Sequence, residues 1–127
     1  DAGQIYNSWP LMGSNYFPDD NNYINLLKLS AFSDPSLVQF IHRNLAYLII
    51  VFYLTLMIKV YSSKLINLYF VINLLGILLF IQTVLGIFTL LYGAQIFLAS
   101  MHQISSIFLV SSSVYFLYLN VNRQPSS

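Results

Sequence analysis

Three long apolar stretches dominate the sequence after its first third. They are Leu37–Tyr61, Leu65–Leu91 and Ile96–Leu119, and short polar breaks separate them. A transmembrane helix needs about 20 consecutive, predominantly apolar residues, and each stretch exceeds that length. The pattern therefore predicts an all-α membrane protein, with a transmembrane domain over residues 36–120 that contains three helices. Three helices make a thin bundle, so we expect them to be part of a four-helix bundle whose fourth helix comes from elsewhere.

The segment before these stretches has a different pattern. Residues 1–35 are polar and rich in turn-forming residues, which predicts an extramembrane loop on the outer side. Within it, Tyr23–Ala31 could form a short interfacial helix with its leucines towards lipid. Trp9, Tyr16 and Tyr23 suit the aromatic belt at the membrane surface. At the other end, residues 121–127 are interpreted as a frayed tail.

Composition agrees with a location in the bilayer. Of the 127 residues, 57% are hydrophobic and only 7% are charged, so lipid is the expected surrounding. The net charge of +1 comes from few, scattered side chains and offers no phosphate-binding face, so no nucleic acid partner is expected. Cysteine is absent, which excludes disulfides, thiolate metal sites and cysteine nucleophiles.

The positions of the charges predict an orientation. Lys59, Lys64 and Arg123 lie at one set of helix ends, and Asp19, Asp20 and Asp34 precede the other end. The positive-inside rule then places the 61–65 loop and the C-terminus in the matrix or cytoplasm, with the N-terminal segment outside. Richness in Ile, Leu, Asn, Tyr and Phe weakly favours an organellar genome, hence the mitochondrial inner membrane. The bacterial plasma membrane is the alternative.

Two histidines are the candidate chemistry. Strongly polar side chains within the bilayer are costly, so His42 and His102 are candidates for function. They lie five and six residues from the outer ends of the first and third apolar stretches, which places both roughly 8–9 Å below the same surface at 1.5 Å per residue. Equal depth on two helices that run in the same direction suits two axial ligands of one metal.

The missing ligand types favour a haem. Zinc or copper sites usually take three or four protein ligands, whereas a porphyrin supplies four nitrogens and leaves two axial positions. Small residues one turn from the histidines (Ala46, Ala99 and Ser106) leave room for a flat ring. Arg43 is the candidate partner of the haem propionates.

The same residues also fit a purely structural role. His42 and His102 could form hydrogen bonds between helices, and Arg43 could extend its charged end to the interface. Gln82 and Gly86, one turn apart, are more typical of helix packing than of a cofactor contact. Spacing alone leaves these alternatives open.

Four sequence runs, in order, resemble the C-terminal half of the heme A synthase family. They are DAGQIYNSWPLMG (residues 1–13), VQFIHRNLAY (38–47), QTVLGIFTLLYG (82–93) and LASMHQISS (98–106). Members have eight transmembrane helices in two similar halves and oxidise a methyl group of haem O to the formyl group of haem A, which terminal oxidases need. The resemblance implies that His42 and His102 are axial ligands of a haem b. Gln39 and Gln103 are expected to lie around that haem or in the adjoining loop.

The resemblance also has a gap. The family's N-terminal half, with the reactive haem, and the first helix of the C-terminal half have no counterpart here. We therefore expect the catalytic half to lie on another chain or to be missing, and this chain alone not to be catalytic. An accessory subunit of a respiratory-chain complex and a small b-type cytochrome that carries electrons are the alternatives.

Overall fold

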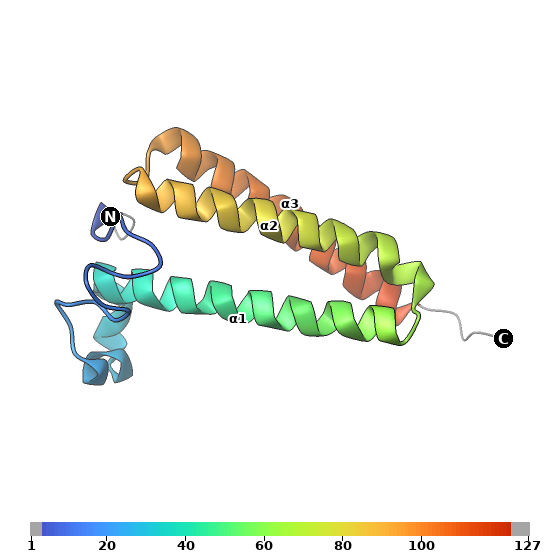
Figure 1. The fold of residues 1–127 in the computed structure, drawn as a ribbon, viewed down its shortest axis with the longest axis horizontal. Coiled ribbons are helices and arrows are strands. Elements are labelled where there is room, and N and C mark those ends of the chain that lie inside the picture. Colours follow the sequence, from blue (N-terminus) through green and yellow to red (C-terminus); the bar gives the residue numbers. More distant parts are fainter. Residues whose placement is uncertain (1–3, 123–127) are drawn as a thin grey trace.

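The computed structural model describes residues 4–122, and three long helices make up most of it (Figure 1). α1 spans Pro35–Ser62, α2 spans Tyr69–Leu91 and α3 spans Ile96–Val121. Three short 3-10 turns accompany them: η2 (Tyr23–Leu27), η3 (Leu29–Ser33) and η4 (Ile66–Leu68). Residues 4–122 contain no β-strand, and the prediction of an all-α fold is confirmed.

Each long helix can cross a membrane. The spans that contain α1, α2 and α3 have mean hydropathies of 1.9, 2.5 and 1.6, and at most 6% of the residues in each most apolar window are buried inside the chain. In water, helices with so many exposed apolar side chains would be costly, whereas lipid solvates them. The chain is therefore an integral membrane protein.

Local chemistry explains where α1 begins. Asp34 is its N-cap residue, and one carboxylate oxygen accepts hydrogen bonds from the backbone amides of Ser36 and Leu37 at 3.0 and 3.3 Å. Pro35 follows at the first helical position, where its missing N–H costs nothing. Together these residues start the helix two positions before the apolar stretch itself.

Two expected helical segments differ in the structure. The expected single helix over Tyr23–Ala31 is replaced by η2 and η3, because Lys28 between them is extended, with φ −94° and ψ 144°. Neither turn has a side-chain N-cap, and so short a segment pays the full cost of helix nucleation. The expected start of the second helix at Leu65 is also shifted: η4 comes first, and α2 begins at Tyr69.

The three helices pack tightly only where α1 passes into α2, which we call the closed end. A cluster of buried apolar residues lies there: Val60, Leu68, Val71, Ile72 and Leu75. Nearby, the Tyr53 hydroxyl donates to the carbonyl of Ile72 at 2.8 Å. Gly76 makes room for it, since a Cβ at this position would collide with the hydroxyl.

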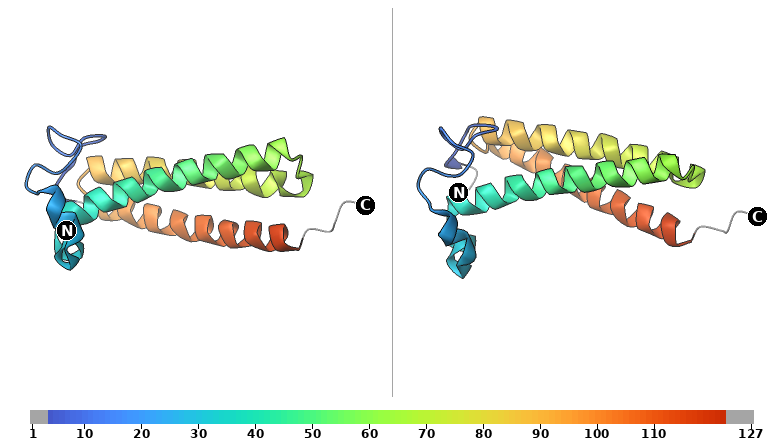
Figure 2. Two further views of the ribbon diagram at one scale, coloured as in Figure 1. Left: turned by 90° about the horizontal axis from the view of Figure 1, so that it is seen from below. Right: turned by 60° about the horizontal axis from the view of Figure 1, so that its bottom comes forward.

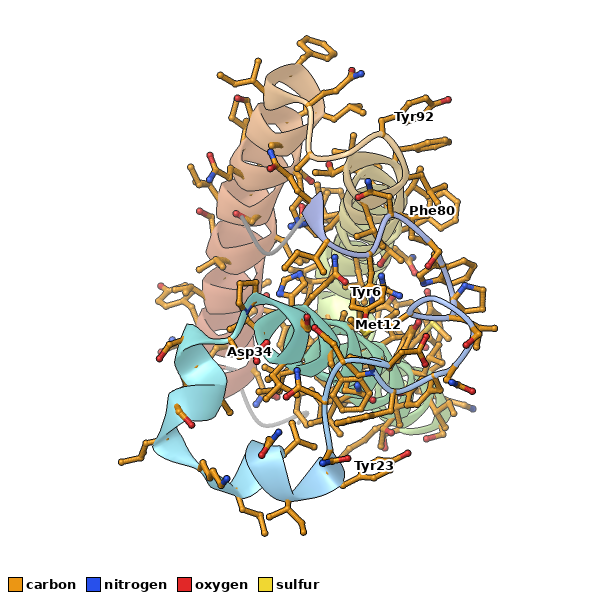
Figure 3. All side chains as sticks on the ribbon, turned by 90° about the vertical axis from the view of Figure 1, so that its left-hand side faces the viewer. Tyr6, Met12, Tyr23, Asp34, Phe80 and Tyr92 are labelled. Carbon is orange, nitrogen blue, oxygen red and sulfur yellow. The ribbon has the colours of Figure 1, made fainter. Side chains whose placement is uncertain are left out.

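Towards the opposite end, α1 diverges from α2 and α3 (Figures 1 and 2). We call this the open end; it contains the start of α1, the end of α2 and the start of α3. The N-terminal segment, which carries Tyr6 and Met12, lies across it (Figure 3). Asn7 reaches the turn between α2 and α3, because its side-chain nitrogen lies 3.8 Å from where a Cβ on Gly93 would be.

Several contacts fix the N-terminal segment to the start of α1. The Asp20 carboxylate accepts hydrogen bonds from Ser36 at 2.7 Å and from the Tyr6 hydroxyl at 3.0 Å. These hydrogen bonds, that of Ser36 above all, hold the pKa of Asp20 below its ordinary value. The Tyr16 hydroxyl donates to the side-chain oxygen of Asn44. Of the predicted tail, residues 123–127 lie outside the described part of the chain, as does Arg123, which the orientation prediction used.

Candidate functional site

A cavity of about 530 Å³ lies between α1 on one side and α2 and α3 on the other. Apolar side chains make up most of its wall, including Ile50, Leu79 and Leu90. His42 and His102 face it from opposite sides, His42 from α1 and His102 from α3. Such a volume with few polar groups is typical of sites for small molecules and cofactors.

The two imidazole rings lie close together although 60 positions separate them in the sequence. Their centroids are 6.4 Å apart, and their planes make an angle of 79°. His102 is half-buried, whereas His42 is exposed in this chain alone. The equal depth expected from helix geometry therefore does bring the two rings to one place.

Gly86 on α2 supports the His102 ring. A Cβ at this glycine would lie 3.0 Å from Cε1 of His102, closer than most Cβ contacts. A side chain at position 86 would thus press on the ring. Gly86 is therefore a helix-packing residue, as its small size suggested, and the side chain that packs against it is His102 on α3.

Gln82 contacts the same ring from one turn earlier on α2. Its amide nitrogen lies 3.5 Å from Nε2 of His102, at the outer limit of a hydrogen bond. The Gln82 oxygen and Nδ1 of His102 are both buried without a partner. With the amide turned over, its oxygen would accept an N–H from one ring nitrogen and leave the lone pair of the other free for a metal.

Arg43 is buried at the same end of the cavity, with 8% of its surface exposed. Its two terminal nitrogens donate to backbone carbonyls of the N-terminal segment and to the side chain of Gln39. Only Nε is left, buried without a partner. Arg43 was expected to bind the haem propionates, but most of its hydrogen-bond donors are thus used within the chain.

The remaining candidates from the sequence divide into two groups. Ala46 and Gln39 line the cavity, whereas Ala99, Ser106 and Gln103 are not among the lining residues. Trp9, assigned above to the aromatic belt, is part of the cavity wall. Nothing in its neighbourhood of the sequence could have indicated this, because the contacts that hold it come from α1.

These residues fit a haem. Two imidazoles bound to one iron with bonds of about 2 Å have ring centroids about 6 Å apart, close to the separation observed. The space that Gly86 leaves for the His102 ring, and Nδ1 of that ring, which has no hydrogen-bond partner, add to this agreement. Among residues 4–122, no group of three or more His, Cys, Asp or Glu side chains is placed to hold a metal ion. A porphyrin supplies four nitrogen ligands itself, so it needs only the two histidines from the protein.

Fold and site together define an integral membrane protein in which two neighbouring histidines line a cavity between the helices. The sequence profile of the cytochrome oxidase assembly protein family COX15-CtaA matches residues 1–114. The chain therefore belongs to this family, that of the heme A synthases.

Similar curated proteins agree. The chain is 41% identical to the heme A synthase of Pelagibacter ubique over 122 residues, which cover 96% of this chain and 36% of that protein. It is 42% identical to the heme A synthase of Rickettsia bellii, covering 91% of this chain and 34% of the relative. It is 40% identical to the heme A synthase of Wolbachia pipientis, covering 91% of this chain and 31% of that protein. The chain thus spans about a third of the length of these relatives, and no solved structure matches it.

Proposed function

We propose that this chain is the C-terminal, haem b-binding part of a heme A synthase, which oxidises the methyl group of haem O to the formyl group of haem A for cytochrome c oxidase. One observation carries the proposal: the imidazoles of His42 and His102 face each other across an apolar cavity with centroids 6.4 Å apart. The similarity to heme A synthases supports the assignment to haem A formation. The catalytic half lies outside these 127 residues.

The two histidines determine what the site can do. A bound haem b supplies one-electron redox chemistry. His42 and His102 would both hold the iron of that haem, which would suit it to electron transfer rather than to binding dioxygen or substrate. It therefore serves electron transfer to or from the catalytic half, and the oxidation itself takes place elsewhere.

Other residues hold the cofactor. Gln82 orients the His102 ring, and the apolar wall excludes water from the cavity. Arg43 contributes a positive charge and its free Nε to an anionic side group of the haem. Gly86 keeps the space that the His102 ring needs.

Lipid and a further helix are the proposed surroundings. His42 lines the cavity and yet is exposed in this chain, so one side of the site is open. A helix from the N-terminal half of the synthase, or from another membrane subunit such as one of a respiratory complex, covers that side. The proposed membrane is the mitochondrial inner membrane, with the bacterial plasma membrane as the alternative that the bacterial relatives favour. The N-terminal segment faces outward and the C-terminus faces the matrix or cytoplasm.

A small b-type cytochrome that only carries electrons is the second candidate. The two neighbouring histidines support it, because a pair of imidazoles on one iron suits one-electron transfer. In that case the chain would hold haem without taking part in haem A synthesis.

Purification from the native membrane separates the candidates. A reduced-minus-oxidised spectrum measures low-spin haem, and the chains that co-purify are identified by mass spectrometry. The purified assembly is then supplied with haem O and an oxidant, either dioxygen together with a reductant or an electron acceptor alone. Formation of haem A that is lost in His102→Ala supports the synthase. Haem without haem A formation indicates an electron carrier, and a chain without haem refutes both.

A further inference from the structure

The guanidinium of Arg43 is surrounded by the backbone of the N-terminal segment. One terminal nitrogen donates to the carbonyls of Pro10 at 3.4 Å and Leu11 at 3.2 Å. The other donates to the carbonyls of Tyr6 at 3.2 Å and Ser8 at 2.8 Å. A single side chain on α1 thus gathers four carbonyls from a stretch of six residues, which we call the cap (Tyr6–Leu11).

Gln39, one turn earlier on α1, completes this arrangement. Its side-chain oxygen accepts from Arg43 at 3.4 Å, and its nitrogen donates to the carbonyl of Tyr6 at 3.2 Å. Both side chains are buried, with 6% and 8% of their surfaces exposed. Hydrogen bonds to five acceptors offset most of the cost of burying the charge, and Nε alone has no partner. The rigid fork of arginine suits several carbonyls at once.

These bonds determine where Trp9 lies. Its neighbours on both sides, Ser8 and Pro10, present their carbonyls to Arg43, so the backbone of Trp9 is held at two adjacent points. Trp9 lines the same cavity as the two histidines. Its flat, largely apolar ring is suited to contact a macrocycle.

We propose that Trp9 forms part of the haem-binding wall and that Arg43 is the residue that positions it, acting through the cap. This proposal rests on the proposed function, since it assumes that the cavity holds haem. A positive charge alone would not be enough for this role, because the terminal N–H groups of Arg43 hold the carbonyls of the cap.

The first measurement needs no haem. The chain contains a single tryptophan, so its intrinsic fluorescence reports Trp9, and Trp9→Phe supplies the background from any co-purifying chain. Trp9 is already 45% exposed, so in the haem-free protein we expect Arg43→Gln and Arg43→Lys both to raise its quenching by acrylamide, by at most about twofold. Lys59→Gln makes the same charge change at the other end of α1 and should have no effect. Unchanged quenching in both Arg43 variants would overturn the role of Arg43.

The second measurement tests whether Arg43 acts through Trp9. Haem loss is followed by transfer to apomyoglobin in wild type, Arg43→Gln, Trp9→Ala and the double variant. We expect each single variant to lose haem about five to ten times faster, and the double variant to fall well short of the product of the two effects, because only the charge pairing proposed above is independent of Trp9. Fully multiplied effects, or full rescue of haem retention by Arg43→Lys, would assign Arg43 to charge pairing alone and overturn the proposal.

The two measurements separate the proposals. A wild-type chain that binds no haem refutes the proposed function and, with it, the contact between Trp9 and haem. The haem-free quenching experiment still decides whether Arg43 holds the cap. Haem bound by His42 and His102 with equal loss rates in wild type and Trp9→Ala leaves the proposed function intact and refutes the role of Trp9.

Discussion

The closed and open ends of this molecule are built from the same three helices but from different kinds of contact. At the closed end, apolar side chains such as Ile72 and Leu75 fill the space between the helices. At the open end, α1 stands away from α2 and α3, and two histidines, two glutamines and an arginine are among the residues that line a cavity. Lipid provides no hydrophobic force to push helices together, so close packing must come from shape. At the open end the surfaces of the helices do not fit together, and a cavity remains between them.

Loss of either histidine should have the largest effect, and at the open end only. His42→Ala and His102→Ala each remove one of the two proposed iron ligands, so we expect low-spin haem to fall to background in both. Membrane insertion should persist, because the apolar spans are unchanged. Haem content per chain and carbonate-resistant membrane association measure the two effects. Leu75→Ala is the matched change at the closed end; haem loss as large as that of the histidine variants would contradict the separation of the two ends.

Two glycines on α2 give the sharpest comparison. In Gly86→Ala the new Cβ presses on the His102 ring, so we expect haem affinity to fall about tenfold, with little change in helix packing. In Gly76→Ala the new Cβ displaces the Tyr53 hydroxyl from the carbonyl of Ile72, so thermal stability should fall by about 1 kcal/mol with haem affinity unchanged. Haem titration and thermal unfolding of both variants test the pair. Equal effects on both readouts would show that the ends are not independent.

Gln82 should have a smaller effect, visible in the haem rather than in the fold. Gln82→Leu keeps the volume but removes the polar contact to His102, so we expect several-fold faster haem loss and a shifted midpoint potential. Gln82→Glu should make the midpoint potential more negative than that of the wild type, because a carboxylate stabilises the oxidised iron. Redox titration of the three proteins checks the order. Identical potentials would remove Gln82 from the haem site.

The smallest predicted effect is a pH dependence of the N-terminal segment. The pKa of Asp20 lies below its ordinary value, chiefly through its hydrogen bond from Ser36, so it stabilises the folded segment above that ordinary value. The contribution is lost as pH falls through the lowered pKa. Because Asp20 is largely exposed, we expect less than about 1 kcal/mol, seen as a rise in acrylamide quenching of Trp9 as the pH falls below about 4.

Asp19 is the matched control for this effect. Its pKa is also lowered, first by a hydrogen bond from Asn15, but no hydrogen bond from α1 reaches it in the described structure. Asp20→Asn should therefore flatten the pH dependence, whereas Asp19→Asn should leave most of it. If Asp19→Asn flattened the pH dependence and Asp20→Asn did not, the acid-sensitive contact would not be the one between Asp20 and Ser36.

The sequence predicted the fold and the pairing of the two histidines, because both follow from local rules. Long apolar stretches indicate helices that span a membrane, and the fixed rise per residue converts position into depth. That is why His42 and His102 could be paired across 60 positions. The resemblance to a family then gave the expected cofactor.

The remaining features depend on contacts that no local pattern contains. Gly86 and Gln82 have the appearance of packing residues, and only the position of α3 beside α2 brings them to His102. Arg43 was assigned to propionates by its charge, whereas the structure engages its terminal nitrogens with carbonyls more than 30 positions away. Trp9 was missed as a wall residue for the same reason.

Electron paramagnetic resonance of the oxidised chain with haem b tests the central claim most directly. Two imidazole ligands whose planes are 79° apart should give the strongly anisotropic low-spin ferric signal of near-perpendicular axial histidines. That signal should disappear in both His42→Ala and His102→Ala. A high-spin signal in the wild type, or a low-spin signal that survives in either variant, would contradict the assignment of these two histidines as the iron ligands.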